Sequence, residues 1–288
     1  MPKRNAAAKR KPAKVPEKKS MIKARPAVAP RRGAKPAPAV KVTAAAKSRA
    51  GSARGSSQRV LVVDVGGTNI KLLATGKREL RRVKSGPDLT PARMVREVRA
   101  AVADWDYDVV TIGCPGPVVG NRIVQNPVNL GGGWMRYDFA KAFGKPVRLV
   151  NDAVMQAIGS YEGGRMLFLG LGTGLGTACI LDGVVAPMEV AHLPYRNATF
   201  EDYVGLRGMK HFGKRRWREF VEDVVSRLRE ALQVEYIVLG GGHVKFLRNL
   251  PTACIAGSNA NAITGGYRLW TQAGRFVLAG AAKKRGKP

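Results

Sequence analysis

Short apolar runs bounded by glycine, proline and polar residues alternate along the chain with stretches of helical periodicity. Apolar runs of this length predict buried strands, and recurrence every three to four residues predicts amphipathic helices. The predicted strands are residues 60–63, 70–74, 81–86, 108–112, 120–124, 146–150, 166–171, 177–181, 236–239 and 253–256. The predicted helices are 91–102, 137–143, 153–161, 199–203, 214–232 and 261–282. Strand, helix and strand in succession are typical of an α/β protein.

The first strand leads into a polar turn, Asp64-Val65-Gly66-Gly67-Thr68, and Lys71 lies on the strand that follows. Glycines without a Cβ let backbone amides approach an anion closely. Thr68 adds a hydroxyl, Lys71 adds a positive charge, and Asp64 can hold a divalent cation or its water shell. We therefore interpret the turn as a phosphate-binding site; the alternative is an ordinary hairpin whose polar residues face water.

A second glycine-rich turn joins the strands at 166–171 and 177–181 and contains Gly172, Thr173, Gly174 and Gly176. Its glycine spacing differs from that of a dinucleotide-binding loop, and a strand follows it instead of a helix. No GxxxxGK[ST] motif is present, which excludes a P-loop. Two such turns facing each other would clamp a phosphate chain from both sides.

Asp152 stands where the strand at 146–150 ends and a helix begins. A helix N-terminus favours the anionic form of the carboxylate, and loops converge at such strand ends. Asp152 is therefore a candidate site residue, with a simple helix cap as the alternative. The loop at 125–134, rich in amides and glycine and ending in Trp134, can offer hydrogen bonds and an apolar wall to a polyhydroxylated ligand, or can be a plain connection.

Glu189 and His192 lie three residues apart in the segment 187–194. They could form a metal pair, but no third ligand is near in sequence, so polar contacts to a sugar or a structural histidine are the other interpretations. Gly240, Gly241 and Gly242 form a further bare loop after the strand at 236–239. The basic run at 214–218 is a solvated helix face or a track for a polyphosphate.

Charge is concentrated at the start of the chain. Residues 1–59 contain 18 Lys and Arg residues and one acidic residue, Glu17, out of a net charge of +30 for 288 residues. With almost no large apolar side chains, residues 1–58 are expected to form a disordered basic arm that binds polyanions without sequence readout. An initiation at Met21 or an organellar transit peptide are alternatives. No apolar run approaches the length of a membrane span, and a cytoplasmic location is expected.

The three cysteines, Cys114, Cys179 and Cys254, are isolated in the sequence. This spacing predicts reduced core residues rather than a disulfide or a metal site.

The motifs, taken together and in order, resemble those of the ROK family of sugar kinases, above all its polyphosphate glucokinase branch. The similarity runs from about residue 60 to 277. The motifs that carry it are DVGGTNIK at 64–71, GCPGPV at 113–118, NPVNLGGGW at 126–134, VND at 150–152, GLGTGLG at 170–176, EVAHLP at 189–194, FEDY at 200–203 and LGGG at 239–242.

The resemblance implies a role for each matching position. Asp152 matches the base that accepts the proton of the sugar 6-hydroxyl; with an ordinary pKa near 4 it would act as the bond to phosphorus forms. The two glycine turns match the phosphate motifs, with Mg²⁺ near Asp64, and Gly240 to Gly242 match a loop near the adenosine of a nucleotide donor. Matching sugar contacts are Asn129, Asn151, Asp152, Glu189, His192 and Glu201. The segment 195–198 contains no cysteine, so no zinc site is expected.

The resemblance also implies a two-lobed actin-like fold of the ribonuclease H type. The expected organisation is the arm at 1–58, a first lobe at 59–152, a second lobe at 153–260, a C-terminal helix at 261–282 packed back on the first lobe, and a basic tail at 283–288.

The activity implied is transfer of a phosphoryl group from polyphosphate, or also ATP, to glucose, by a protein expected to be a homodimer. The alternatives are an ATP-dependent kinase for another hexose and a non-catalytic sugar-sensing or nucleic-acid-associated protein. Against the last, the arm shows no helix pair to read a DNA groove.

Overall fold

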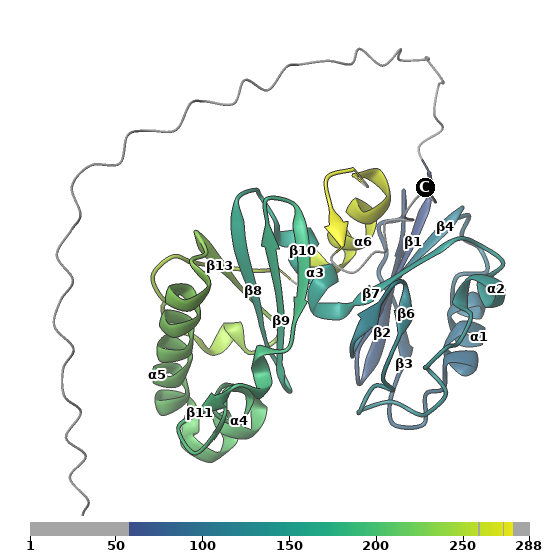
Figure 1. The fold of residues 1–288 in the computed structure, drawn as a ribbon. Coiled ribbons are helices and arrows are strands. Elements are labelled where there is room, and N and C mark those ends of the chain that lie inside the picture. Colours follow the sequence, from purple (N-terminus) through teal and green to yellow (C-terminus); the bar gives the residue numbers. More distant parts are fainter. Residues whose placement is uncertain (1–57, 259, 273, 279–288) are drawn as a thin grey trace, which may run out of the picture. The chain divides into compact units, whose positions relative to one another are not determined.

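The structure is a computed structural model that describes residues 58–258, 260–272 and 274–278. These residues belong to one compact unit that contains two β-sheets with helices beside and between them (Figure 1). The expected basic arm, apart from Gln58, and the expected basic tail lie outside the described residues.

The first sheet has five strands in the order β3-β2-β1-β4-β7. Its strands are β1 (Val60–Val65), β2 (Asn69–Ala74), β3 (Arg81–Lys84), β4 (Val109–Cys114) and β7 (Val147–Asn151). The strands β1, β2 and β3 form an antiparallel meander, and β4 and β7 run parallel to β1. The carboxyl ends of the three parallel strands therefore meet at one edge of the sheet.

The second sheet has six strands in the order β14-β13-β8-β9-β10-β15. Its strands are β8 (Arg165–Leu171), β9 (Leu175–Leu181), β10 (Val184–Met188), β13 (Tyr236–Gly240), β14 (Cys254–Ala256) and β15 (Val277–Leu278). An antiparallel meander, β8 to β10, is again followed by two parallel strands, β13 and β14. The two sheets share one plan, which confirms the predicted two-lobed α/β fold.

Six helices accompany the two sheets in the part of the chain described. They are α1 (Pro91–Ala101), α2 (Phe139–Phe143), α3 (Asp152–Ser160), α4 (Phe200–Val204), α5 (Leu206–Leu232) and α6 (Asn261–Thr271). As predicted, α1 starts after Thr90, whose side chain accepts a hydrogen bond from the Arg93 amide. Gly213, at φ 74°, interrupts α5, and the predicted start at residue 214 marks only its second segment.

Two predictions of secondary structure differ from the structure. Residues 120–124 do not form one strand but a tight hairpin of β5 (Val118–Val119) and β6 (Arg122–Ile123), because Gly120 and Asn121 both adopt positive φ, as a two-residue hairpin turn requires. The C-terminal helix ends at Thr271 instead of 282, and β15 follows it and pairs with β10.

The remaining short elements are β11 (Pro194–Tyr195), β12 (Ala198–Thr199) and the 3-10 turns Val190–His192 and Val244–Phe246.

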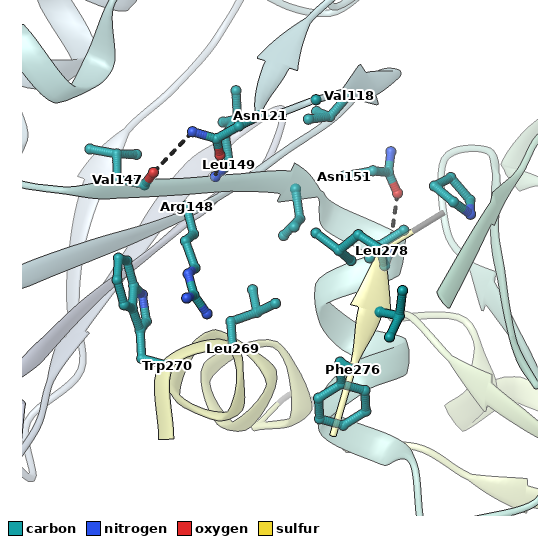
Figure 2. Close-up of a pocket in the computed structure, with 15 residues that line it drawn as sticks. Val118, Asn121, Val147, Arg148, Leu149, Asn151, Leu269, Trp270, Phe276 and Leu278 are labelled. Carbon is teal, nitrogen blue, oxygen red and sulfur yellow. Dashed lines mark hydrogen bonds between the residues drawn. The ribbon is translucent and has the colours of Figure 1, made fainter. Parts of the chain in front are cut away.

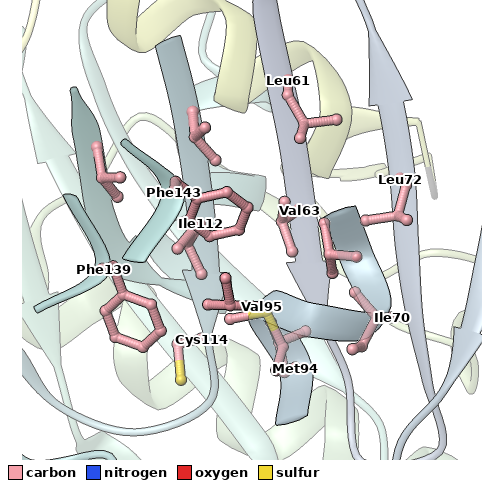
Figure 3. Close-up of a cluster of buried hydrophobic side chains, with 14 of the residues drawn as sticks. Leu61, Val63, Ile70, Leu72, Met94, Val95, Ile112, Cys114, Phe139 and Phe143 are labelled. Carbon is pink, nitrogen blue, oxygen red and sulfur yellow. The ribbon is translucent and has the colours of Figure 1, made fainter. Parts of the chain in front are cut away.

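The strands β1 and β4 are buried on both faces, which explains their continuous apolar runs. One face of the first sheet packs under α1 and α2; Figure 3 shows Leu61, Ile112 and Met94 in this cluster. The opposite face, with Val60 and Val62, packs against α3 and α6, and α3 also contacts the second sheet. Figure 1 shows both helices between the sheets. A separate cluster joins the second sheet to α5.

The helices α3 and α6 cross at glycines. A Cβ on Gly159 would lie 1.8 Å from the Asn261 carbonyl oxygen, and one on Gly265 would lie 1.8 Å from the Met155 carbonyl oxygen. Since no other residue fits this approach, the glycines determine how closely the two helices between the sheets can pack.

Candidate active site

A cavity of about 560 Å³, here called the cleft, lies between the two sheets, where the carboxyl end of β7 meets the turn between β8 and β9. Gly66, Gly67 and Thr68 line it from the first sheet. From the second lobe it is lined by Gly172, Thr173, Gly174 and Gly176. The two predicted phosphate turns therefore border the same cavity, although they lie far apart in the sequence.

The first turn is held by hydrogen bonds across its base. The Gly66 amide donates to the Asn69 carbonyl at 3.1 Å, the Ser85 amide donates to the Thr68 carbonyl at 3.0 Å, and the Ser85 hydroxyl donates to the Gly66 carbonyl at 2.6 Å. Ser85 follows β3 and was not singled out from the sequence. The bonds from Ser85 occupy carbonyl groups of the turn. None of these hydrogen bonds uses the amides of Gly67 and Thr68.

Asp64 and Lys71 lie behind the first turn and not among the residues that line the cleft. They are directly opposite each other in the register of β1 and β2, and the Lys71 Nζ lies 3.1 Å from the Asp64 Oδ2. Asp64 is buried and Lys71 half-buried. The lysine predicted to neutralise phosphate is thus paired with the carboxylate predicted to hold the cation.

The second turn is tied to α4 and α5. The Leu175 amide donates to the Glu201 Oε2 at 3.0 Å, and the Leu206 amide donates to the Gly172 carbonyl at 3.1 Å and the Thr173 carbonyl at 3.2 Å. A Cβ on Gly174 would lie 2.3 Å from the same Glu201 oxygen. Glu201, expected only as a sugar contact, therefore also braces the turn.

Asp152 lines the cleft at the first position of α3. Asn151 caps this helix, with its Oδ1 accepting from the Ala153 amide at 2.9 Å, and its Nδ2 donates to the Gly116 carbonyl at 3.0 Å. The cap is therefore Asn151, which fixes the direction of Asp152. Asp152 Oδ1 accepts a hydrogen bond from the adjacent Ala153 amide, at 2.9 Å.

Burial, then the charge on Asp64 and to a smaller extent the charge on Glu189, together raise the pKa of Asp152 to about 6, against backbone hydrogen bonds that lower it. The ordinary pKa near 4 expected for this carboxylate is therefore wrong. A pKa close to neutral suits a group that accepts a proton during reaction and then releases it.

The remaining predicted sugar contacts, Asn129, Glu189 and His192, also line the cleft. Glu189 and His192 are exposed at the two ends of the 3-10 turn that follows β10. Trp134 does not form the expected apolar wall: it is fully buried in the core of the first lobe, and its Nε1 donates to the Leu89 carbonyl at 3.1 Å. Instead, Gln156 and Phe168 line the cleft, and no motif marks either of them.

Of the three glycines after β13, only Gly241 lines the cleft. Gly241 has φ 85°, and a Cβ there would lie 2.3 Å from the Leu171 carbonyl oxygen. Gly240 is buried against Phe168, and Gly242 is exposed outside the cleft. The loop thus brings one bare backbone position to the cavity wall.

The described residues contain no group of three or more His, Cys, Asp and Glu side chains arranged to hold a metal ion. Mg²⁺ commonly binds through one or two carboxylates together with substrate phosphates and water. Asp64 and Asp152 are close enough for the charge on one to raise the pKa of the other, so the oxygen donors present fit this mode of binding.

A larger cavity of about 770 Å³ lies on the other side of β7, between that strand, α6 and β15 (Figure 2). Its walls are mainly apolar, and the Arg148 guanidinium lies 4.2 Å from the centre of the Trp270 ring. Asn121 braces its upper edge, donating to the Val147 carbonyl at 3.0 Å and accepting from the Leu149 amide at 2.6 Å. No carboxylate and neither of the two phosphate turns lines this larger cavity, so the candidate chemistry belongs to the smaller one.

The three cysteines are free, and Cys114 and Cys179 are buried as predicted, while Cys254 is half-buried. Burial raises the pKa of each thiol, and most strongly that of Cys114. None of them lines the cleft. No helix in the described ranges is long and apolar enough to cross a membrane.

Residues 60–187 match the sequence model of the ROK family. A curated glucokinase of Pyrobaculum calidifontis is 31% identical over 135 residues, an alignment that spans 44% of this chain and 45% of that protein. The chain thus spans about half the length of this curated relative.

Among solved structures, the inorganic polyphosphate/ATP-glucomannokinase of Arthrobacter sp. strain KM superposes with a TM-score of 0.66 and 22% identity, covering 75% of this chain and 99% of that chain. A ROK family transcriptional regulator, homologous to the E. coli MLC protein, superposes with a TM-score of 0.62 and 15% identity, covering 76% and 79%. These structures share the fold, and the fold alone does not separate a kinase from a regulator.

Proposed function

We propose that the protein is a ROK-family sugar kinase that transfers a phosphoryl group from polyphosphate or ATP to the 6-hydroxyl of glucose; the match of residues 60–187 to the ROK family model supports this. One observation carries the proposal. Two glycine turns from different lobes border one cavity, and Asp152, with a pKa of about 6, lies on the wall of the same cavity.

The proposed sugar site is the part of the cleft formed by Asn129, Glu189, His192 and Glu201, with Asn151 and Asp152 beside it. Carboxylate, amide and imidazole groups can pair with the hydroxyls of a hexose in both donor and acceptor roles. Asp152 would accept a hydrogen bond from the 6-hydroxyl, orient its oxygen towards phosphorus and take its proton as the new bond forms.

The proposed phosphate site is formed by the turns at Gly66 to Thr68 and Gly172 to Gly176. Phosphoryl transfer through a loose transition state requires positioned donors and spread charge more than covalent chemistry by the protein. Amides of the two turns and the Thr68 hydroxyl would supply the donors. Mg²⁺, held near Asp64, would neutralise part of the charge on the phosphates when bound.

Both donors are compatible with the site. The Arthrobacter glucomannokinase, which shares the fold, is a polyphosphate/ATP enzyme. Gly241 in the cleft wall would allow close approach of a nucleoside, and the positive charge of the chain favours a polyanion. We propose polyphosphate as the donor with ATP as a second possibility; a kinase that uses only ATP or another hexose is the main alternative.

A non-catalytic sugar sensor is the alternative of another class, since a regulator shares the fold. It is disfavoured because Asp152 lies in the cleft in a position that raises its pKa, whereas sugar binding alone requires no proton acceptor.

The test is to incubate the full chain with Mg²⁺ and glucose, mannose or another hexose, and to supply polyphosphate or ATP in parallel. Formation of the sugar 6-phosphate, identified by its phosphorus NMR signal, is expected with polyphosphate. Product with ATP alone would exclude polyphosphate as donor. Sugar binding without product from either donor would overturn the kinase proposal and favour the sensor.

A further inference from the structure

A second pocket adjoins the cleft at the second glycine turn. This outer pocket, of about 510 Å³, is lined by Thr173, Leu206, Arg207, Lys210 and His211. Thr173 lines both the outer pocket and the cleft. The two pockets therefore adjoin at Thr173, beside the start of α5.

Backbone hydrogen bonds hold the start of α5, which lines the outer pocket, against the second glycine turn. The Leu206 amide at the start of α5 donates to the Gly172 and Thr173 carbonyls. Gly205 makes this approach possible, because a Cβ there would lie 3.1 Å from the Thr173 carbonyl oxygen. The first turns of α5 thus have a defined position beside the phosphate turn.

Arg207, Lys210 and His211 are three and four residues apart on the first segment of α5, so they share one face of it. All three are exposed. Arg207 is paired with Asp202 of α4, whereas within the described ranges no ion pair involves Lys210 or His211. The face therefore offers nitrogen donors and at least one cation whose charge is not neutralised by a neighbouring carboxylate.

This arrangement suits a long anion better than a compact one. The cleft has to hold a hexose as well as the reacting phosphates, so a longer phosphate chain has to leave it. Beyond Thr173 a long polyphosphate would lie next to the positive side chains of Arg207 and Lys210 instead of bulk water. A nucleotide donor, by contrast, would direct its nucleoside towards Gly241, which lines the cleft but not the outer pocket.

We propose that the face of α5 formed by Arg207, Lys210 and His211, together with Thr173, binds the part of a linear polyphosphate that extends beyond the phosphates held in the cleft. The proposal rests on the proposed function, since it assumes that phosphates occupy the second turn. It gives the protein a site that distinguishes long polyphosphate from tripolyphosphate and from ATP.

The direct test is lysine footprinting of the full chain with acetic anhydride, read by mass spectrometry, without sugar and therefore without turnover. Long-chain polyphosphate is expected to reduce acetylation of Lys210 several-fold, while tripolyphosphate at the same phosphate concentration has little effect. Lys77 is the internal control, because it lies in the turn after β2, at the opposite end of the first sheet from the glycine turn. Equal acetylation of Lys210 with and without the long polymer would overturn the proposal.

The matched variants are Lys210→Glu and Lys77→Glu, which change the net charge equally at exposed positions. Lys210→Glu should raise the KM for long-chain polyphosphate about threefold to tenfold, the effect of one exposed charge-assisted contact, and leave the KM for ATP or tripolyphosphate unchanged. Equal KM values for long-chain polyphosphate in the two variants would overturn the proposal.

The outcomes separate this site from the proposed function. If no donor phosphorylates any hexose while Lys210 is protected by the long polymer, the kinase proposal fails and the polyphosphate site stands. If polyphosphate phosphorylates glucose while Lys210 is neither protected nor required, the kinase proposal stands and the site on α5 fails.

Discussion

Besides burial, the charge on the Asp64 carboxylate of β1 raises the pKa of Asp152, which is 88 positions away in the sequence and begins α3 directly after β7. They meet because β1 and β7 are parallel strands of one sheet whose carboxyl ends point the same way. The site thus contains two nearby carboxylates, of which one is paired with Lys71 and the other is poised near neutral pH.

The first prediction concerns the pH dependence of turnover. Asp152 accepts a proton only when ionised, so kcat/KM should fall below about pH 6, where its carboxyl becomes protonated. In Asp64→Asn the neighbouring charge is lost, and the acid limb of the profile should move to lower pH, whatever the remaining rate. A profile measured at several pH values with one sugar and one donor checks both points; an acid limb unmoved in Asp64→Asn would contradict the coupling.

Replacing the proposed base gives the second prediction. Asp152→Asn should retain sugar binding, measured by tryptophan fluorescence, and lower kcat by about 10² to 10⁴-fold, the usual contribution of a general base. Asp138→Asn is the control, since Asp138 is exposed and caps α2 away from the cleft. A kcat close to that of the control would remove Asp152 from the mechanism.

The same substitution should stabilise the fold. The pKa of Asp152 is raised in the folded protein from 3.8 to about 6, so the ionised carboxylate destabilises the native state at high pH. Well below pH 4 the Asp152 carboxyl is protonated in both the folded and the unfolded protein, so this destabilisation disappears. Urea unfolding should therefore show Asp152→Asn to be more stable by about 2 kcal/mol at pH 8, with a difference that shrinks as the pH falls from 6 towards 4. A constant difference across this range would contradict the raised pKa.

Substitutions of Glu201 can separate its hydrogen bond to the second turn from its proposed contact with the sugar. In Glu201→Ala the Leu175 amide loses its acceptor, so the KM for the phosphoryl donor should rise about tenfold, together with the KM for sugar. Glu201→Gln keeps an oxygen that can accept this bond, and should affect mainly the KM for sugar. Steady-state kinetics with each substrate varied in turn distinguishes them, and an unchanged donor KM in Glu201→Ala would show that the brace on the turn is dispensable.

The crossing of α3 and α6 can be tested by stability. Gly265→Ala places a methyl group where the Met155 carbonyl lies, and should lower the unfolding free energy by about 2 to 4 kcal/mol. Gly132→Ala is the control, because a Cβ there meets nothing within 4 Å and the glycine has no positive φ. Urea denaturation of both variants checks this, and equal midpoints would mean that the helices can separate without cost.

The local features were predictable because they depend on neighbours in the sequence. The buried strands predicted at 60–63 and 166–171, the cap at Thr90 and the glycine turns all follow from apolar runs, capping residues and glycine chemistry. The helix predicted to continue to residue 282 ends at Thr271, where β15 forms against β10 instead. Pairing with a distant strand is a tertiary contact, and local periodicity does not report it.

The sequence by itself determined most of the elements, the α/β class and the set of polar turns, since each of these is encoded in adjacent residues. Only the tertiary structure decided which turns share a cavity, that Trp134 is core, that Glu201 supports the second turn and that Asp152 has a pKa of about 6. The physical reason is that burial, electrostatic coupling and tertiary hydrogen bonds depend on distances between residues far apart in the chain, which no local pattern records.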